Sequence, residues 1–369
     1  MMDEFSAALA SLNIPLFTAV AVFLDQYAYL LFLGIAAAFY LLRPSVRKNK
    51  LKLAAFLISL LVMAILVVAV KAGTQQPRPC IVPSDYLKLP YCPFDYSFPS
   101  GHTAFAFTFA GASLGTGVFP VFFLLAIITA LSRIYLGVHT INDVAGGIVL
   151  ALATYFIIEG WLRHFFPRLL HVREEHFEKQ KRGGFALELR RQAAHAAFGM
   201  GILLLIWFVG RPGTELLLVL ALFLGMAAMH LRMERRRTAL IDELFDLLER
   251  PKVMPAKGAF MYVLGALLVL SALSDPVKAM AAIAVLAWGD AAATLAGRMN
   301  GGKTRLFYNS GKSWAGAAAF FALGSLAAYP FIGLAALPLA FVCALAETLN
   351  VGVDDNFLIP LAALAFFLL

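Results

Sequence analysis

Three polar clusters in the first half of the chain combine residue types that suit phosphate chemistry. Their candidate phosphate ligands are three cations and the start of an apolar run: Lys71, Arg78, Arg133, Ser100 and Gly101. The cations can neutralise phosphate oxygens and the charge that develops during phosphoryl transfer. Free backbone N–H groups at a helix start, which we expect directly after Pro99, also favour an anion.

Two histidines complete these clusters. His139 and Asp143 are spaced i, i+4, so they share a face if one helix runs through both residues. Asp143 would then hold the imidazole and stabilise its cation while His139 attacks phosphorus and forms a phosphohistidine. His102 would protonate the leaving oxygen and then activate water.

The order of the clusters is K-x6-RP, then PSGH, then SR-x5-H-x3-D, and it resembles the type 2 phosphatidic acid phosphatase superfamily. The resemblance covers about residues 25–163, and every motif position is present. It implies a lipid phosphatase or pyrophosphatase that needs no metal and uses the residues in the roles named above. Either residues 1–24 supply the sixth helix of that family's usual core, or they lie at the membrane interface.

A second set of charged and Gly-rich segments, late in the chain, suits a nucleotide. The candidates for binding a triphosphate are Arg298, Lys303, Lys312 and Ser313. The carboxylates that can hold Mg²⁺ through oxygen ligands are Asp290, Glu347 and Asp354 or Asp355. Phosphoryl transfer needs mainly positioning and charge neutralisation, and these groups can provide both.

Four short motifs run through this region. R-x3-H joins Arg191 to His195, and GD-x2-A-x3-GR, KS-x2-G and DN-x3-P (with Asn356) follow it. Over about residues 186–369 they resemble the dolichol kinase and phytol kinase family of CTP-dependent polyprenol kinases. The resemblance implies CTP as phosphoryl donor, Mg²⁺ as cofactor, Asp290 in catalysis and an isoprenoid alcohol as acceptor. These motifs do not separate that family sharply from the phosphatidate cytidylyltransferases, so transfer of CMP to a lipid phosphate is an alternative.

The composition places both sets of residues in a membrane. Hydrophobic residues make up 61% of the chain and charged residues 14%, against about 45–50% and about 25% in a soluble domain. Apolar runs near 20 residues recur along the whole length, which excludes an ordinary soluble enzyme and a disordered chain. Their Leu, Phe and Ala content favours helices over the strands of a barrel. We therefore predict an all-α polytopic membrane protein with two helical bundles and about twelve transmembrane helices.

The apolar runs predict the positions of these helices. Five spans are expected near 26–42, 53–70, 101–118, 120–137 and 144–162, and seven near 193–209, 214–231, 258–274, 277–297, 314–330, 332–349 and 356–369. Residues 1–24, broken by Asn13 and Pro15, are expected to form an interfacial or re-entrant helix. The expected parts are a phosphatase domain over 1–163, a basic linker over 164–185 and a kinase-like domain over 186–369.

The net charge of +8 gathers in loops 43–52, 163–191 and 232–257. The positive-inside rule places these loops, including the linker, in the cytoplasm. Loop 72–98 and the phosphatase site then lie outside the cell membrane, and the kinase site lies inside. Because the charge is explained by orientation, we do not expect nucleic-acid binding. Cys80 and Cys92 share the outer loop and are either a disulfide or two free thiols.

These observations predict a bifunctional enzyme acting on isoprenoid lipid carriers. The outer site would dephosphorylate a polyprenyl phosphate or pyrophosphate, and the inner site would make polyprenyl phosphate from polyprenol and CTP. A lipid-binding flippase or scaffold without turnover is an alternative of another class, but such a protein has no need of the His139–Asp143 pair.

Overall fold

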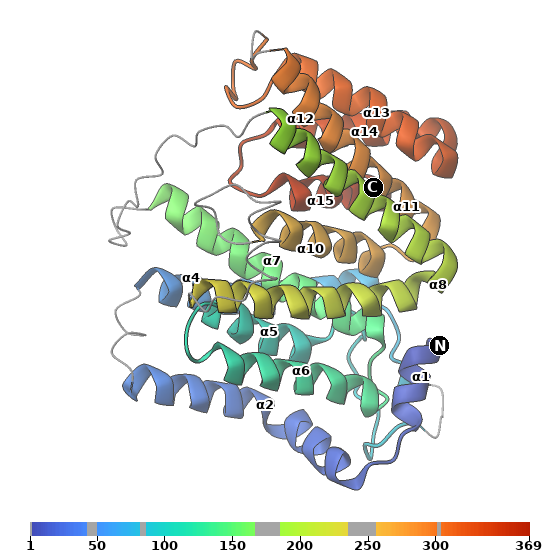
Figure 1. The fold of residues 1–369 in the computed structure, drawn as a ribbon. Coiled ribbons are helices and arrows are strands. Elements are labelled where there is room, and N and C mark those ends of the chain that lie inside the picture. Colours follow the sequence, from blue (N-terminus) through green and yellow to red (C-terminus); the bar gives the residue numbers. More distant parts are fainter. Residues whose placement is uncertain (1, 43–49, 82–85, 167–184, 235–255, 301–303) are drawn as a thin grey trace. The chain divides into compact units, whose positions relative to one another are not determined.

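The computed structural model describes residues 2–42, 50–81, 86–166, 185–234, 256–300 and 304–369, and helices are the regular elements of these ranges (Figure 1). The chain divides into two compact units, Met1–Glu175 and His176–Leu369. The division falls within the range expected as the linker, most of which lies outside the described residues. Each unit is described by itself.

The first unit is a helical bundle. Its helices are α1 (Glu4–Ser11), α2 (Pro15–Leu42), α4 (Lys50–Thr74), α5 (Gly101–Ser113), α6 (Phe119–Tyr135) and α7 (Ile141–Phe165), with the short 3₁₀ helix η1 (Pro79–Ile81). Each of the five spans expected here overlaps one of the last five α-helices, although α5 ends at Ser113 and not near residue 118. Helices α4, α5 and α7 pack against one another, and α6 packs against α2 and α5.

The start of the chain differs from its prediction. Residues 1–24 do not form one interfacial helix, because α1 ends at Ser11 and α2 begins at Pro15 and continues through the first expected span. Proline suits the first position of a helix, where its missing N–H is not needed, so Pro15 starts α2 instead of interrupting a helix. The first span is therefore 28 residues long.

The second unit consists of further apolar helices. They are α8 (Phe185–Met233), α10 (Lys257–Ala272), α11 (Pro276–Ala284), the π-helix η2 (Val285–Gly289), α12 (Asp290–Met299), α13 (Trp314–Ile332), the 3₁₀ turn η3 (Gly333–Ala335), α14 (Ala336–Thr348) and α15 (Asp355–Leu368). Helix α8 contains both spans expected near 193–209 and 214–231, joined at a kink where Gly210 has a φ of 75° and Pro212 follows.

The lengths and apolarity of the helices confirm the predicted fold class. Among the described residues, six helical stretches are long and apolar enough to cross a membrane: Pro15–Leu42, Lys50–Thr74, Ile141–Phe165, Phe185–Met233, Pro276–Met299 and Trp314–Thr348. The 49 residues of α8 form two helices that meet at the kink at Gly210. At 1.5 Å per residue each is about 35 Å long, enough for one crossing of a core of about 30 Å. The chain is an all-α polytopic membrane protein.

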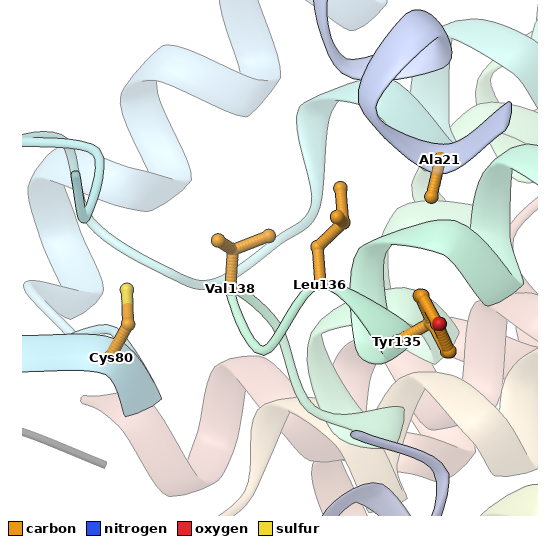
Figure 2. Packing of buried hydrophobic residues seen from close by; sticks show 5 residues of the cluster. All are labelled: Ala21, Cys80, Tyr135, Leu136 and Val138. Carbon is orange, nitrogen blue, oxygen red and sulfur yellow. The ribbon is translucent and has the colours of Figure 1, made fainter. Parts of the chain in front are cut away.

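A small apolar cluster supports the turn between α6 and α7 (Figure 2). Its buried members are Ala21, Cys80, Tyr135, Leu136 and Val138. Gly137 lies within this turn with a φ of 76°. A Cβ at Gly137 would also lie 2.6 Å from the backbone oxygen of Tyr86, so another residue would be strained and would displace the outer loop. The turn is therefore fixed between the two helix ends that carry Arg133 and His139.

Candidate active sites

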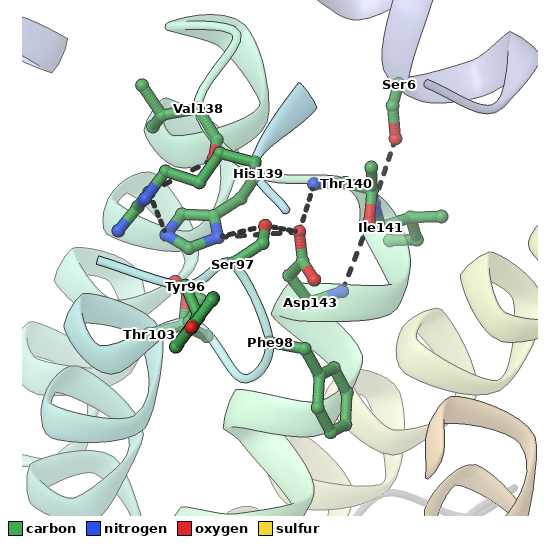
Figure 3. Close-up of polar contacts among 12 residues, drawn as sticks. Ser6, Tyr96, Ser97, Phe98, Thr103, Val138, His139, Thr140, Ile141 and Asp143 are labelled. Atoms are coloured by element: carbon green, nitrogen blue, oxygen red, sulfur yellow. Dashed lines mark hydrogen bonds and ion pairs between the residues drawn. The ribbon is translucent and has the colours of Figure 1, made fainter. Parts of the chain in front are cut away.

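His139 and Asp143 are in contact, but not because they share a helix. Helix α7 begins at Ile141, and Asp143 is the third residue of its first turn. Thr140 and Asp143 form a capping box, in which the backbone N–H of Thr140 donates to Asp143 Oδ2 at 2.8 Å. His139 stands just before this cap, and its Nδ1 lies 3.4 Å from the same Oδ2 (Figure 3). The expected contact thus arises from a capped helix start.

The other imidazole nitrogen of His139 faces Arg78. Arg78 Nη1 lies 3.0 Å from His139 Nε2, and a guanidinium can only donate hydrogen bonds. Nε2 must then accept, which places the proton of the neutral ring on Nδ1, toward Asp143. The hydroxyl of Ser97 donates to Asp143 Oδ2 at 2.6 Å and lies 3.4 Å from Nδ1. The lone pair of the neutral ring is therefore on Nε2, on the side of Arg78.

Lys71 and Arg78 converge on one carboxylate that the sequence analysis did not single out. Lys71 Nζ lies 2.7 Å from Asp95 Oδ2, and Arg78 Nη2 lies 2.6 Å from Asp95 Oδ1. The backbone oxygens of Tyr96 and Val138 accept from Lys71 and Arg78 respectively. The two cations from the end of α4 and the outer loop thus form one positive pocket beside His139.

The third cation has a carboxylate partner of its own. Arg133, at the end of α6, donates from Nη2 to Asp25 Oδ1 on α2 at 2.7 Å. His102 Nε2 lies 3.2 Å from the backbone oxygen of Asp25, so Asp25 brings the predicted acid and the third cation together. Arg133 is 2% exposed, and within the described residues its Nε and Nη1 have no hydrogen-bond partner. A buried guanidinium with two unused donors is suited to an anion.

Ser100 and Gly101 mark the start of α5, as expected. Ser100 is fully buried, and its backbone N–H donates to the backbone oxygen of Asp143 at 2.9 Å. Its hydroxyl accepts from Thr103 Oγ1 at 3.0 Å. A Cβ at Gly147 would lie 2.7 Å from the Ser100 backbone oxygen, so α7 approaches this loop closely. The first turn of α5 is held against the first turn of α7.

The charge states of His139 and Asp95 suit this chemistry. Burial lowers the pKa of His139 to about 3, although Asp143 works in the opposite direction, so the resting ring is neutral. Partial burial raises the pKa of Asp95, but its hydrogen bond to Lys71 and the charge of Arg78 outweigh this and hold the pKa at about 2. The site therefore combines a neutral nucleophile with an ionised carboxylate on its cations.

The structure joins Cys80 and Cys92 in a disulfide with Cα atoms 5.6 Å apart. The bond ties the segment that follows Arg78 to the segment that leads to Asp95. Of the two possibilities that the sequence leaves open, the described structure thus contains the disulfide.

Comparison with known proteins shows what the first half of the chain resembles. Residues 52–166 match the family model described as the PAP2 superfamily. The N-terminal half of the chain resembles the PAP2 superfamily. This confirms the resemblance expected from the motifs, and all of the phosphatase candidates lie within the matched range.

Two further proteins are similar to the chain. An uncharacterized protein, MJ1137 of Methanocaldococcus jannaschii, is 29% identical over 175 residues, which are 47% of this chain and 88% of that protein. The crystal structure of Aquifex aeolicus LpxE has 30% sequence identity, covers 42% of this chain and 92% of its own, and gives a TM-score of 0.35.

Outside the PAP2 region, the second unit brings its predicted carboxylates together. One oxygen each from Asp290, Glu347 and Asp355 lies within 4.8 Å of the others. Asp290 begins α12 directly after the π-helix η2, and π-helical turns are frequent at functional sites. Of the two alternatives for the last ligand, Asp355 joins this group, whereas Asp354 caps α15 by accepting from the N–H of Asn356. Burial raises the pKa of Asp354.

Lys312 reaches the same carboxylates from the loop before α13. Its Nζ lies 2.7 Å from Asp355 Oδ2 and also contacts Glu347. Burial opposes the charge, but Asp355 and Glu347 raise the pKa of Lys312 above its usual value. Asn309 fixes the loop by donating to the backbone oxygen of Thr348 at 2.9 Å. The ammonium is thus held, charged, at the carboxylate group.

The remaining candidates of this unit lie near the same helix ends. His195 Nε2 lies 3.6 Å from Asp290 Oδ2. Arg191 and Arg298 both contact Glu188, at 3.1 Å and 2.5 Å. Ser313 caps α13, and its hydroxyl accepts from the N–H of Gly316. The amide of Asn356 donates to the backbone oxygen of Gly258 at 3.2 Å, and Lys303 lies outside the described residues.

Three residues of the outer site were missed by the sequence analysis. Asp25 was detectable, because a lone carboxylate inside an apolar span is expensive and usually functional. Asp95 had a weaker signal, since two clustered cations require a counter-charge nearby. Ser97 had none, because its role depends on how the outer loop folds over the start of α7.

Proposed function

We propose that the first unit is a membrane lipid phosphatase that acts on polyprenyl phosphate or pyrophosphate. The observation that carries this proposal is the arrangement around His139. Its Nδ1 faces the Asp143 carboxylate at 3.4 Å, and its Nε2 lies 3.0 Å from a guanidinium of the positive pocket. A nucleophile oriented by a carboxylate and adjoining an anion site is the arrangement that phosphoryl transfer through a covalent intermediate requires.

The reaction has two steps. A bond forms between His139 Nε2 and phosphorus while the bond between phosphorus and the leaving oxygen breaks, and His102 gives that oxygen a proton. Asp143 stabilises the positive charge that the imidazole acquires. Water then attacks the phosphohistidine, His102 takes a proton from the water, and the bond between phosphorus and Nε2 breaks to release inorganic phosphate. Lys71, Arg78 and Arg133 neutralise the transferred group in both steps.

Aromatic side chains beside His102 support an apolar substrate chain. The ring of Tyr29 lies 4.7 Å from the ring of His102, and Phe32, Phe105, Phe109 and Phe122 continue the series of contacts along the bundle. The series reaches a mainly apolar cavity of about 350 Å³ between α2, α4, α5 and α6, lined by Phe56, Phe109 and Phe122 among others. Apolar walls with few polar groups are typical of sites for apolar ligands.

The test is phosphate release by the purified full-length protein from a polyprenyl diphosphate in detergent. We expect release by the wild type and by Glu159→Gln, whose carboxylate pairs with Arg163 near the far end of α7. We expect none from His139→Ala. If the wild type releases no phosphate, the result would favour the alternative of a flippase or scaffold that binds head groups without turnover.

We further propose that the second unit is a CTP-dependent polyprenol kinase. The observation that favours it is the meeting of three carboxylates and Lys312 from four separate segments. The oxygen donors suit Mg²⁺, for which Asp290, Glu347 and Asp355 would be the ligands. When bound, Mg²⁺ would neutralise charge on the nucleotide phosphates.

The side chains of this unit have separate tasks in that reaction. Lys312 and Arg298 would bind the triphosphate close to the start of α13, which Ser313 caps. Asp290, which lies 3.6 Å from His195, would orient the polyprenol hydroxyl for transfer.

Labelled CTP separates the kinase from the cytidylyltransferase alternative. With CTP labelled in its γ-phosphate and a panel of prenols, phytol and diacylglycerol, a kinase transfers label to the lipid. With CTP labelled in its α-phosphate and a lipid phosphate as acceptor, only a cytidylyltransferase does so.

Together, the two activities would recycle an isoprenoid carrier. The distribution of basic loops supports a phosphatase site outside the cell membrane and a kinase site inside. The test is hydrolysis of a membrane-impermeant, short-chain prenyl diphosphate by intact cells. Hydrolysis without lysis is expected, and hydrolysis that appears only after lysis would contradict this orientation.

A further inference from the structure

The Asp95 carboxylate occupies the positive pocket in the manner of a bound anion. One oxygen contacts Lys71 Nζ at 2.7 Å, and the other contacts Arg78 Nη2 at 2.6 Å. These are the cations expected to bind phosphate, and the Nη1 of the same guanidinium adjoins the nucleophile. A phosphate group that binds Lys71 and Arg78 through two oxygens therefore needs the place that Asp95 fills.

The cations are held in position by other acceptors as well. Arg78 donates from Nε to the backbone oxygen of Asp95 at 2.9 Å and from Nη1 to that of Val138 at 3.1 Å. Lys71 also donates to the backbone oxygen of Tyr96. The pocket thus keeps its shape when the carboxylate of Asp95 leaves.

Exposure distinguishes the partner that can move from those that cannot. The side chains of Lys71 and Arg78 are 11% and 6% exposed, whereas that of Asp95 is 55% exposed. A half-exposed carboxylate can rotate into water, where it is well solvated, at little cost. The buried cations have no such alternative, because an unpaired buried charge is strongly unfavourable.

We propose that Asp95 is a built-in competitor for the phosphate site, so that a substrate phosphate must displace it from Lys71 and Arg78 to bind. This inference rests on the proposed phosphatase function, since it assigns the same pocket to the substrate. An incoming monoanion exchanges one negative charge for another, so one of the two positive charges stays uncompensated before and after the exchange. A terminal phosphate or pyrophosphate brings at least one charge more, which compensates the second cation.

The test measures the binding of small anions and requires no turnover. Full-length wild-type protein, Asp95→Ala, Asp95→Asn and the control Glu159→Gln are compared by competition against radiolabelled inorganic phosphate at neutral pH. Sulfate and methyl sulfate are the competitors, because they share a tetrahedral head but carry two charges and one charge. When Asp95 occupies the site, the apparent affinity for every anion falls in proportion to the fraction of sites left free. Removing Asp95 should therefore tighten the binding of both sulfate and methyl sulfate by roughly tenfold or more.

We expect wild type and Glu159→Gln to bind sulfate more tightly than methyl sulfate, and both Asp95 variants to bind both anions more tightly than the wild type does. Weaker binding of both anions in the Asp95 variants would overturn the proposal, because Asp95 would then be a tether for the cations. Equal binding of sulfate and methyl sulfate by the wild type would also overturn it, even if neither variant folds. Failure of the phosphatase proposal has a different signature: anions bind, but wild-type protein releases no phosphate from any lipid.

Discussion

The hydroxyl of Ser6 accepts a hydrogen bond of 2.9 Å from the backbone N–H of Ile141, 135 positions along the chain. Ser6 is fully buried on α1, and Ile141 is the first residue of α7. The Ser6 hydroxyl itself donates to Asp3 Oδ2 at 2.6 Å. The short first helix therefore caps the helix start that carries the nucleophile and its carboxylate.

Replacing Ser6 tests this link. Ser6→Ala leaves a buried N–H without its partner, so we expect a loss of about 1–3 kcal/mol in the free energy of unfolding of the first unit. We also expect a lower kcat, because the start of α7 is less well fixed. Thermal unfolding and phosphate release measure the two effects. Ser11→Ala is the matched control, since Ser11 lies exposed on the same helix and bonds only within it; an equal effect of both changes would remove the special role of Ser6.

Replacing Asp143 tests the orientation of the nucleophile. Asn keeps an acceptor for the N–H of Thr140 but removes the charge that stabilises the imidazolium. We therefore expect Asp143→Asn to fold and to lose roughly two to four orders of magnitude in kcat, with little change in KM. Steady-state phosphate release checks this against Glu159→Gln, a carboxylate-to-amide change on the same helix. Wild-type kcat in Asp143→Asn would show that the carboxylate does not assist His139.

The ionisation of His139 gives a pH prediction. Its pKa is lowered from 6.5 to about 3, so between these values the unfolded chain binds a proton that the folded chain does not. The stability contributed by this group is therefore complete above pH 6.5 and decreases as the pH falls below it.

Ring ¹⁵N signals of histidine-labelled protein measure this directly. The His139 signals, assigned by their loss in His139→Gln, should stay those of a neutral ring with the proton on Nδ1 from pH 8 to pH 5. A titration midpoint inside that interval would contradict the neutral resting state.

Much of the outer site was predictable because its parts are local. Local sequence indicates each of these helix ends. The signals are Pro99 before Ser100 and Gly101, a cation that follows an apolar run, and a histidine close to an acid. The contact between His139 and Asp143 was expected for the wrong reason, since the spacing of four residues suggested a shared helix. The capping box of Thr140 brings the two side chains together instead.

What could not be predicted depends on segments far apart in sequence. Asp95 reaches Lys71 across 24 positions, and Asp25 reaches Arg133 across 108. No periodicity encodes such pairs, because they depend on how the outer loop folds and how α2 packs on α6. In the second unit, likewise, the pairing of Arg298 with Glu188 has no local signal.

Replacing Asp290 separates the two proposed activities. Asp290→Asn removes one of the three clustered carboxylates, so we expect loss of CTP-dependent phosphorylation of polyprenol and unchanged phosphate release from polyprenyl diphosphate. Transfer of label from γ-labelled CTP measures the first activity. Asp275→Asn, at the start of α11 and outside the carboxylate group, is the matched control. Full kinase activity in Asp290→Asn would remove this residue from the mechanism.

The covalent intermediate is the most direct test of the central claim. Wild-type protein is mixed with a polyprenyl diphosphate carrying ³²P in its terminal phosphate, quenched within the first turnover and digested. We predict alkali-stable, acid-labile label on the peptide that contains His139, and no label in His139→Ala. Turnover of the wild type with no labelled protein, or label that persists in His139→Ala, would contradict the assignment of His139 as the nucleophile.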